Sequence, residues 1–175
     1  RVMVLTAKYN DGKVPELNEA LLSEPYVVAY QAQIKSLIEE VYCPAIENYR
    51  FRDALSAMLD VVRLGNKLLT DYEPWKLIKT DEAKTLGILR LCLESLVDIA
   101  IVCEPFLPFS ANKILGYFNL SDPGFNYLNI KLSTGAALGA PFYLFEEVED
   151  EVIAKKLAEL EEIRKSRMEK EQSID

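Results

Sequence analysis

Residues 81–102 read DEAKTLGILRLCLESLVDIAIV, and this stretch decides the fold. Apolar residues recur in it at alternating steps of three and four, the spacing that places side chains on one face of an α-helix. After the first turn, the only charged row is made of Arg90, Glu94 and Asp98. A helix that is apolar outside one narrow row is typical of the centre of a helical bundle.

Helical spacing continues on both sides of this central stretch. The residues expected to face the core are, in chain order, Val2, Leu5 and Ala7, then Val27, Tyr30, Ile34, Leu37 and Val41, then Phe51, Leu55, Met58, Val62 and Leu69, and finally Ile114 and Leu115. Pro44 is expected to bend or interrupt the second helix, because proline lacks a backbone N–H. A charged last helix is expected to begin at Asp150.

The pattern predicts an all-α fold, an antiparallel bundle of five to six helices with short connections. Residues 1–145 are predicted to form the bundle, and residues 146–175 a charged helix or linker. Residues 141–145, Pro-Phe-Tyr-Leu-Phe, are too apolar for a free linker, so we expect this run to pack across the helices.

Composition narrows the class of protein. The chain has 175 residues, 50% hydrophobic and 27% charged, which suits one soluble domain. The most apolar region, residues 86–109, contains four charged residues and is too interrupted to cross a bilayer, and the first residues lack the apolar block of a signal peptide. We therefore expect a cytoplasmic protein. The three cysteines form no C-x-x-C pair, so neither a metal site nor a disulfide framework is predicted.

The net charge of −8 is unevenly distributed. Residues 146–175 hold eleven acidic and six basic residues and so carry −5 of it, which leaves the rest of the chain close to neutral. Bases are expected to gather near the only tryptophan and are candidate phosphate contacts: Arg50, Arg52, Arg63, Lys67, Lys76 and Lys79. The alternative is that these bases are the solvated faces of two helices.

The tryptophan itself follows a proline, in the segment Asn66 to Leu77 that reads NKLLTDYEPWKL. Pro74 cannot continue the preceding helix and disfavours helical geometry in the residue before it, so Trp75 should be presented from a fixed corner. A large ring at such a corner can stack on a flat ligand. The alternative is that Trp75 is a core residue that plugs the corner.

These residues, in this order, resemble a known family. The segment Tyr49 to Leu55 (YRFRDAL), the Asn66 to Trp75 spacing, Pro105-Phe106-Leu107-Pro108 and the Leu-Phe-Glu-Glu run at 144–147 are similar to the anticodon-binding helical bundle of methionyl-tRNA synthetases, which belong to class Ia. The similarity covers roughly residues 1–151.

The resemblance implies roles for four residues. A tryptophan after a proline stacks on the first anticodon base in the family, and Pro74 and Trp75 match that pair. Arg1 matches an arginine that hydrogen-bonds anticodon bases, whereas the asparagine expected four positions earlier would precede the chain. Asn66 matches a position near the same corner, either as a base contact or as support for the helix end.

The resemblance also implies an enzyme, methionine–tRNA ligase, with ATP bound in a separate catalytic domain. The chain contains no histidine, so the histidine-containing ATP signature is missing, and Arg1 begins directly in a helical pattern. We therefore interpret the chain as a tRNA-binding fragment with no catalytic residue, metal or cofactor of its own. The implied partners are the methionine tRNA and the catalytic domain, with dimerisation only through a further C-terminal domain.

Two alternatives stay open at this point. The first is the equivalent bundle of a sister class Ia synthetase, the cysteinyl or valyl enzyme, which would read another anticodon. The second is a helical protein-interaction module in which Trp75 is buried and no RNA is bound.

Overall fold

The computed structural model describes residues 1–120, 128, 130–145 and 147–172, with side chains up to residue 166. The chain divides into two compact units, Arg1–Phe142 and Tyr143–Asp175. The first contains the helices α1 to α8 and the second contains α9 (Asp150–Gln172). Within the described residues, six α-helices have eight or more residues, which confirms the predicted all-α fold.

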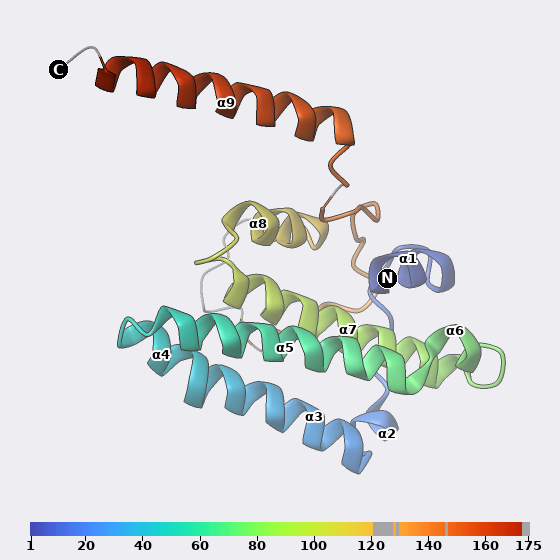
Figure 1. Cartoon of the computed structure of the whole chain (residues 1–175). Helices are drawn as coiled ribbons and strands as arrows, with labels where there is room; N and C mark the ends of the chain where they lie inside the picture. Colours follow the sequence, from blue (N-terminus) through green and yellow to red (C-terminus); the bar gives the residue numbers. More distant parts are fainter. Residues whose placement is uncertain (121–127, 129, 146, 173–175) are drawn as a thin grey trace. The chain divides into compact units, whose positions relative to one another are not determined.

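The central helix is α7 (Glu82–Cys103), as its sequence predicts. It starts at Asp81, whose carboxylate accepts a hydrogen bond of 2.9 Å from the backbone N–H of Lys84 and so caps the first turn. Side chains are buried on almost every side of α7. Figure 1 shows why: α1, α5, α6 and α8 all lie along it.

The other helices of the bundle pack on α7 or, like α3 and α4, on α5 (Figure 1). Their bounds are α1 Val2–Tyr9, α2 Glu19–Leu22, α3 Pro25–Ser36, α4 Cys43–Glu47, α5 Phe51–Tyr72, α6 Pro74–Leu77 and α8 Pro108–Tyr117. The π-helical segment η1 (Leu37–Tyr42) joins α3 to α4 without a break. Within the described ranges, one isolated antiparallel β-bridge pairs Lys13 with Ala137.

The expectation that Pro44 bends or interrupts the second helix is wrong, because α3, η1 and α4 follow one another directly. Proline has no N–H to bond to the carbonyl four residues earlier, and the wider π turn of η1 lies directly before it. The turn carries Tyr42 into the core, where its hydroxyl donates a 2.8 Å hydrogen bond to the carbonyl of Val102. The helix therefore changes its winding around Pro44 and keeps its direction (Figure 1).

The predicted core face of α5 is only partly right. Met58 and Leu69 are buried, whereas Phe51 is 54% and Leu55 40% exposed. The buried row consists instead of Ala54, Ala57, Met58, Val61, Leu68 and Leu69. η1 packs on α5, and the buried row of α5 includes two small alanines, whereas the larger side chains of Phe51 and Leu55 lie outside it.

The charged row of α7 is buried rather than solvated. The guanidinium of Arg90 donates to the carbonyl of Pro15 at 2.7 Å, to Thr134 Oγ1 at 2.8 Å and to the carbonyl of Leu132. Its Nε donates to Glu94 Oε1 at 3.2 Å, and the other carboxylate oxygen of Glu94, Oε2, accepts from the ammonium of Lys131 at 3.0 Å. This network attaches the loop before α2 and the segment after α8 to the central helix.

The run at 141–145 packs less than predicted. Phe142 is half-buried, with its ring centroid 6.5 Å from that of Tyr117 and 4.9 Å from the ammonium of Lys113. Phe145 is 68% exposed and Tyr143 86%, and both belong to the second unit. Only the phenylalanine nearest to α8 is therefore part of the bundle. The boundary predicted after residue 145 stays a prediction.

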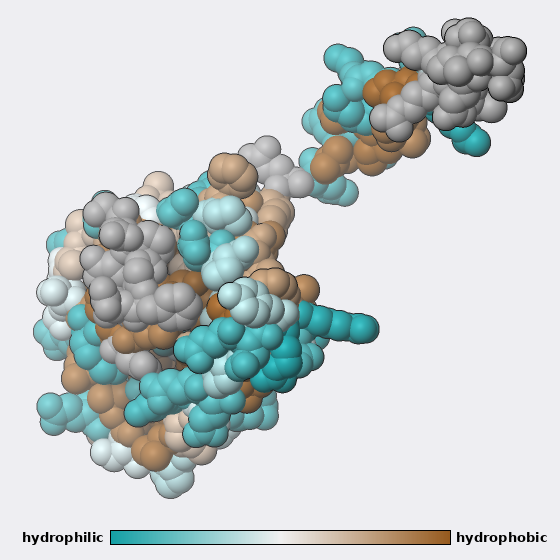
Figure 2. Space-filling view, turned by 90° about the vertical axis from the view of Figure 1, so that its left-hand side faces the viewer, coloured by the Kyte–Doolittle hydropathy of each residue, from teal (hydrophilic) through white to brown (hydrophobic). Residues whose placement is uncertain are grey.

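The surface of the bundle mixes apolar and polar side chains. Figure 2 faces the end at which α5 begins, and hydrophobic residues there are interspersed with hydrophilic ones. Tyr49, two residues before the first residue of α5, is 79% exposed. Among the helices that the structure describes, none is both long and apolar enough to cross a membrane.

Replacement of Arg90 by alanine tests the buried network. Removing one member of a buried ion pair leaves the other charge uncompensated, which costs about 3–5 kcal/mol. We expect Arg90→Ala to lower the free energy of unfolding by that amount in urea titrations. Arg52→Ala, at an exposed position, should change it by less than about 0.5 kcal/mol. Equal small effects would show that the network does not hold the loops.

Candidate nucleic-acid interface

The corner after α5 is built from one residue in the left-handed conformation and one proline. Glu73 has φ 45° and ψ 59°, and Pro74 starts the single turn α6. The carbonyl of Glu73 accepts hydrogen bonds from the backbone N–H groups of Lys76 at 2.8 Å and Leu77 at 3.1 Å. The chain thus turns sharply within two residues, which fixes the direction in which Trp75 leaves the backbone.

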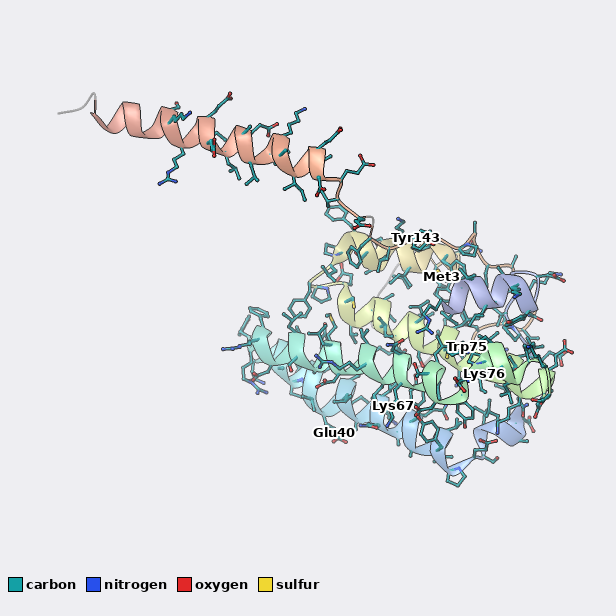
Figure 3. The ribbon with its side chains drawn as sticks, turned by 45° about the vertical axis from the view of Figure 1, so that its right-hand side comes forward. Met3, Glu40, Lys67, Trp75, Lys76 and Tyr143 are labelled. Carbon is teal, nitrogen blue, oxygen red and sulfur yellow. The ribbon has the colours of Figure 1, made fainter. Side chains whose placement is uncertain are left out.

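Trp75 is half-buried at this corner. Part of its ring packs against the hydrophobic core, while the guanidinium of Arg1 lies 5.2 Å from the ring centroid. This is the distance of a cation–π contact. Figure 3 shows Trp75 and Lys76 beyond the end of α5, beside α1. The ring is therefore neither a plug of the core nor a free side chain.

A groove of about 330 Å³ adjoins Arg1 and runs between α1, α5 and α7. Its lining is mostly apolar, with Arg1, Arg63, Asn66 and Ser95 as the polar members; the others are Val2, Val62, Gly65, Leu69, Cys92, Leu96 and Ile99. At Gly65 a Cβ would lie 3.3 Å from Ile99 Cδ1, so the absence of a side chain lets the two helices approach closely. The structure therefore brings Arg1 and Asn66 to one groove.

The cysteine of this groove is not a reactive group. Burial raises the pKa of the Cys92 thiol to about 12, so it stays protonated at neutral pH. Asn66 is exposed and lines the groove, so its side-chain amide can donate and accept there. Its backbone carbonyl accepts a 2.9 Å hydrogen bond from the hydroxyl of Thr70.

The six candidate phosphate contacts do not all gather at this corner. Arg50 and Arg52 lie where α5 begins, about 33 Å along the helix axis from its end at 1.5 Å per residue. That expectation of gathering is wrong for these two, because the length of α5 separates them from Trp75. The remaining four lie in its C-terminal part or after it: Arg63, Lys67, Lys76 and Lys79.

Three of the six bases are already paired with acids of their own turn. Arg50 lies 2.9 Å from Asp53, Arg63 2.6 Å from Asp60 and Lys76 2.8 Å from Glu73. Exposed pairs of this kind contribute little and are easily exchanged for another anion. Arg52, Lys67 and Lys79 are exposed and have no ion pair within the described part of the chain.

The α7 wall of the groove was missed by the reading of the sequence. The spacing of residues 81–102 predicts a helix packed at the centre of the bundle, yet Ser95, Leu96 and Ile99 of this helix line the groove. Apolar spacing on a helix cannot distinguish a packed neighbour from an open groove. The only available signal was Gly65, a small residue facing this part of α7.

Comparison with known families identifies this arrangement. Residues 18–165 match the family model described as the anticodon binding domain of methionyl tRNA ligase. The chain belongs to this family. The match favours the methionyl family over the cysteinyl and valyl families, whose equivalent bundles were the alternative. The matched residues include Asn66 and Trp75.

The curated proteins that are similar to this chain are named methionine–tRNA ligases. The methionine–tRNA ligase of Parabacteroides distasonis is 37% identical over 168 residues, which cover 95% of this chain and 24% of that protein. The enzyme of Flavobacterium psychrophilum is 38% identical over 172 residues, which cover 92% of this chain and 24% of that protein. The chain thus spans about a quarter of the length of the relatives it matches.

Solved structures give the same fold. The free methionyl-tRNA synthetase of Mycobacterium tuberculosis superposes with a TM-score of 0.77 at 25% identity, covering 85% of this chain and 30% of that one. The same enzyme in complex with methionyl-adenylate gives 0.76 at 26% identity, covering 84% and 29%. The helical bundle is therefore that of the family.

The contact between Arg1 and Trp75 can be tested by fluorescence, because Trp75 is the only tryptophan. The guanidinium covers part of the ring, so we expect Arg1→Ala to raise the acrylamide quenching constant of Trp75. Lys8→Ala, which removes an ammonium from the ring of Tyr9, should leave it unchanged. An unchanged constant in Arg1→Ala would contradict the geometry described here.

Proposed function

We propose that this domain binds the anticodon loop of methionine tRNA, as part of a methionyl-tRNA synthetase that joins methionine to its tRNA at the expense of ATP. The observation that carries the proposal is the half-exposed ring of Trp75, fixed by Pro74 and accompanied by the guanidinium of Arg1. An open groove with polar groups at its rim adjoins it. Membership of the anticodon-binding family supports the same function.

Trp75 supplies the stacking surface in this proposal. Single-stranded bases are recognised by stacking on aromatic rings and by hydrogen bonds to their edges, at about 1–3 kcal/mol per stacked base. The first anticodon base stacks on the exposed part of the ring. Because Arg1 lies over that ring, its guanidinium either sandwiches the base or moves to the edge of the base as it enters.

Arg1 and Asn66 supply hydrogen bonds. The planar guanidinium of Arg1 presents several donors in a fixed geometry, which suits two acceptors on one base edge. The amide of Asn66 offers one acceptor and two donors at the rim of the same groove, for a base edge or for the helix end. The apolar walls of the groove suit the faces of a base.

Basic side chains near the corner neutralise the phosphates of the loop. Arg63, Lys67, Lys76 and Lys79 lie on the part of the bundle that carries Trp75. Arg50 and Arg52 are candidates for phosphates farther from the anticodon. The acidic balance of the rest of the chain limits non-specific binding to nucleic acid.

Catalysis belongs to the whole enzyme in this proposal. We assign ATP binding and methionine activation to a catalytic domain that is a partner of this domain, with no catalytic residue, metal or cofactor in the chain itself. A cytoplasmic location and dimerisation through a further C-terminal domain are parts of the same proposal.

Trp75→Ala tests the stacking role. Loss of one stacked base should weaken binding of the methionine anticodon stem-loop about 5- to 150-fold, which corresponds to 1–3 kcal/mol. Tyr49→Ala is the matched control, because it removes an exposed ring at the other end of α5. In the full-length enzyme, ATP–pyrophosphate exchange should be unaffected. A parallel fall in exchange and aminoacylation would mark Trp75 as structural.

Arg1→Lys tests base reading. A flexible ammonium cannot reproduce the planar fork of a guanidinium, so the full-length variant should discriminate less between matched and mismatched anticodons. The measurement is the ratio of dissociation constants for stem-loops that differ in one anticodon base. Equal losses on both would instead assign Arg1 to a phosphate.

A further inference from the structure

A cluster of hydrogen-bonded side chains lies directly before the Trp75 corner. The hydroxyl of Tyr72, the last residue of α5, donates to the carboxylate of Glu24 at 2.8 Å. The other oxygen of Glu24 accepts from the ammonium of Lys84 at 2.6 Å. Glu24 precedes the first residue of α3, and Lys84 lies in the first turn of α7. One carboxylate thus joins three helices.

A second bond repeats the connection one residue earlier. The hydroxyl of Tyr26 in α3 donates to the carboxylate of Asp71 at 2.5 Å. The rings of Tyr26 and Tyr72 meet edge to face, with centroids 5.7 Å apart and planes at 73°. The ammonium of Lys84 lies 5.3 Å from the ring centre of Tyr72. Both Asp71 and Tyr72 are therefore held from α3.

These bonds act on the backbone that carries the tryptophan. Only Glu73 and Pro74 separate Tyr72 from Trp75, and the φ angle of Pro74 is fixed by its ring. Glu73 is in the left-handed conformation, which a residue with a side chain keeps only where its surroundings hold it. Little rotational freedom remains between the held end of α5 and the ring of Trp75.

We infer that Glu24, Tyr26, Asp71, Tyr72 and Lys84 form a corner latch that positions Trp75 for base stacking. The latch residues are positioning residues: they act through the end of α5 on the aromatic ring. The inference rests on the proposed anticodon-binding function and adds to it the residues that set the selectivity of the stacking site.

The ionisation of the latch suits this role. The hydrogen bonds from Lys84 and Tyr72 hold the pKa of the Glu24 carboxyl below its usual value, so it stays an acceptor at neutral pH. Burial raises the pKa of Tyr26 to about 12, and it raises that of Tyr72 as well, so both hydroxyls remain donors. The latch is thus fully formed at physiological pH.

The experiment removes the two hydroxyls and keeps both rings. Tyr26→Phe and Tyr72→Phe are combined in one full-length variant, with Tyr49→Phe as a control that removes an exposed hydroxyl elsewhere. Two quantities are measured. One is the ratio of dissociation constants for stem-loops with the methionine anticodon and with a changed first base. The other is the fluorescence anisotropy and acrylamide quenching of Trp75, measured on the same substitutions in the 175-residue chain, where Trp75 is the only tryptophan.

We expect the double variant to lose about fivefold of its preference for the correct first base, the size of one or two hydrogen bonds. Trp75 should show lower anisotropy and stronger quenching. The preference at the other two anticodon bases and the salt dependence of binding should not change, because phosphate contacts are untouched. The control should match the wild type in every measurement.

Other outcomes separate the two proposals. Unchanged preference and unchanged Trp75 fluorescence in the double variant would overturn the latch, as would an equal loss of affinity for all stem-loops. A wild-type protein without preference for the methionine anticodon would overturn the proposed function, and the fluorescence would still decide the latch. If the double variant fails to fold, Lys84→Met is measured in the same way; it removes the ion pair to Glu24 and the cation–π contact with Tyr72 and keeps both tyrosine hydroxyls.

Discussion

The burial of α7 on nearly all sides is the constraint on which the rest of the structure depends. A helix in that position must have its charged row neutralised inside the protein, since an unpaired buried charge is far more costly than an exposed one. Arg90 and Glu94 meet this need with each other and with the carbonyls and side chains of two loops. The central helix therefore organises the connections of the bundle as well as its helices.

The candidate RNA site follows from the same arrangement. Three elements that pack on α7 supply it: α1 brings Arg1, α5 brings Asn66, and α6 brings Trp75. None of the three could form the site alone, because the stacking ring, the guanidinium and the groove come from different helices. Their relative placement depends on α7 and on the hydrogen bonds at the end of α5.

The sequence predicted the parts of the molecule that depend on local patterns. The extent and central place of α7, the proline corner and the family were all read correctly, since periodicity and the order of motifs decide them. The core face of α5 was predicted only in part, because Ala54 and Ala57 are buried in place of the larger Phe51 and Leu55. The partnership of Glu24 with Tyr72, 48 residues apart, could not be read at all. Contacts of this kind depend on how the helices pack on one another, and the local sequence pattern of one helix does not determine that packing.

The bonds of Arg90 also bear on when the bundle is completed during synthesis. Its partners lie at Pro15, Leu132 and Thr134, so the central helix joins the beginning of the chain to a segment made more than a hundred residues later. Contacts so distant in sequence form late, after local helices. A nascent chain that ends before Leu132 contains helices α1 to α8 but lacks the two latest partners of Arg90. The buried charge of the central helix is then compensated in full only when the bundle is almost completely translated.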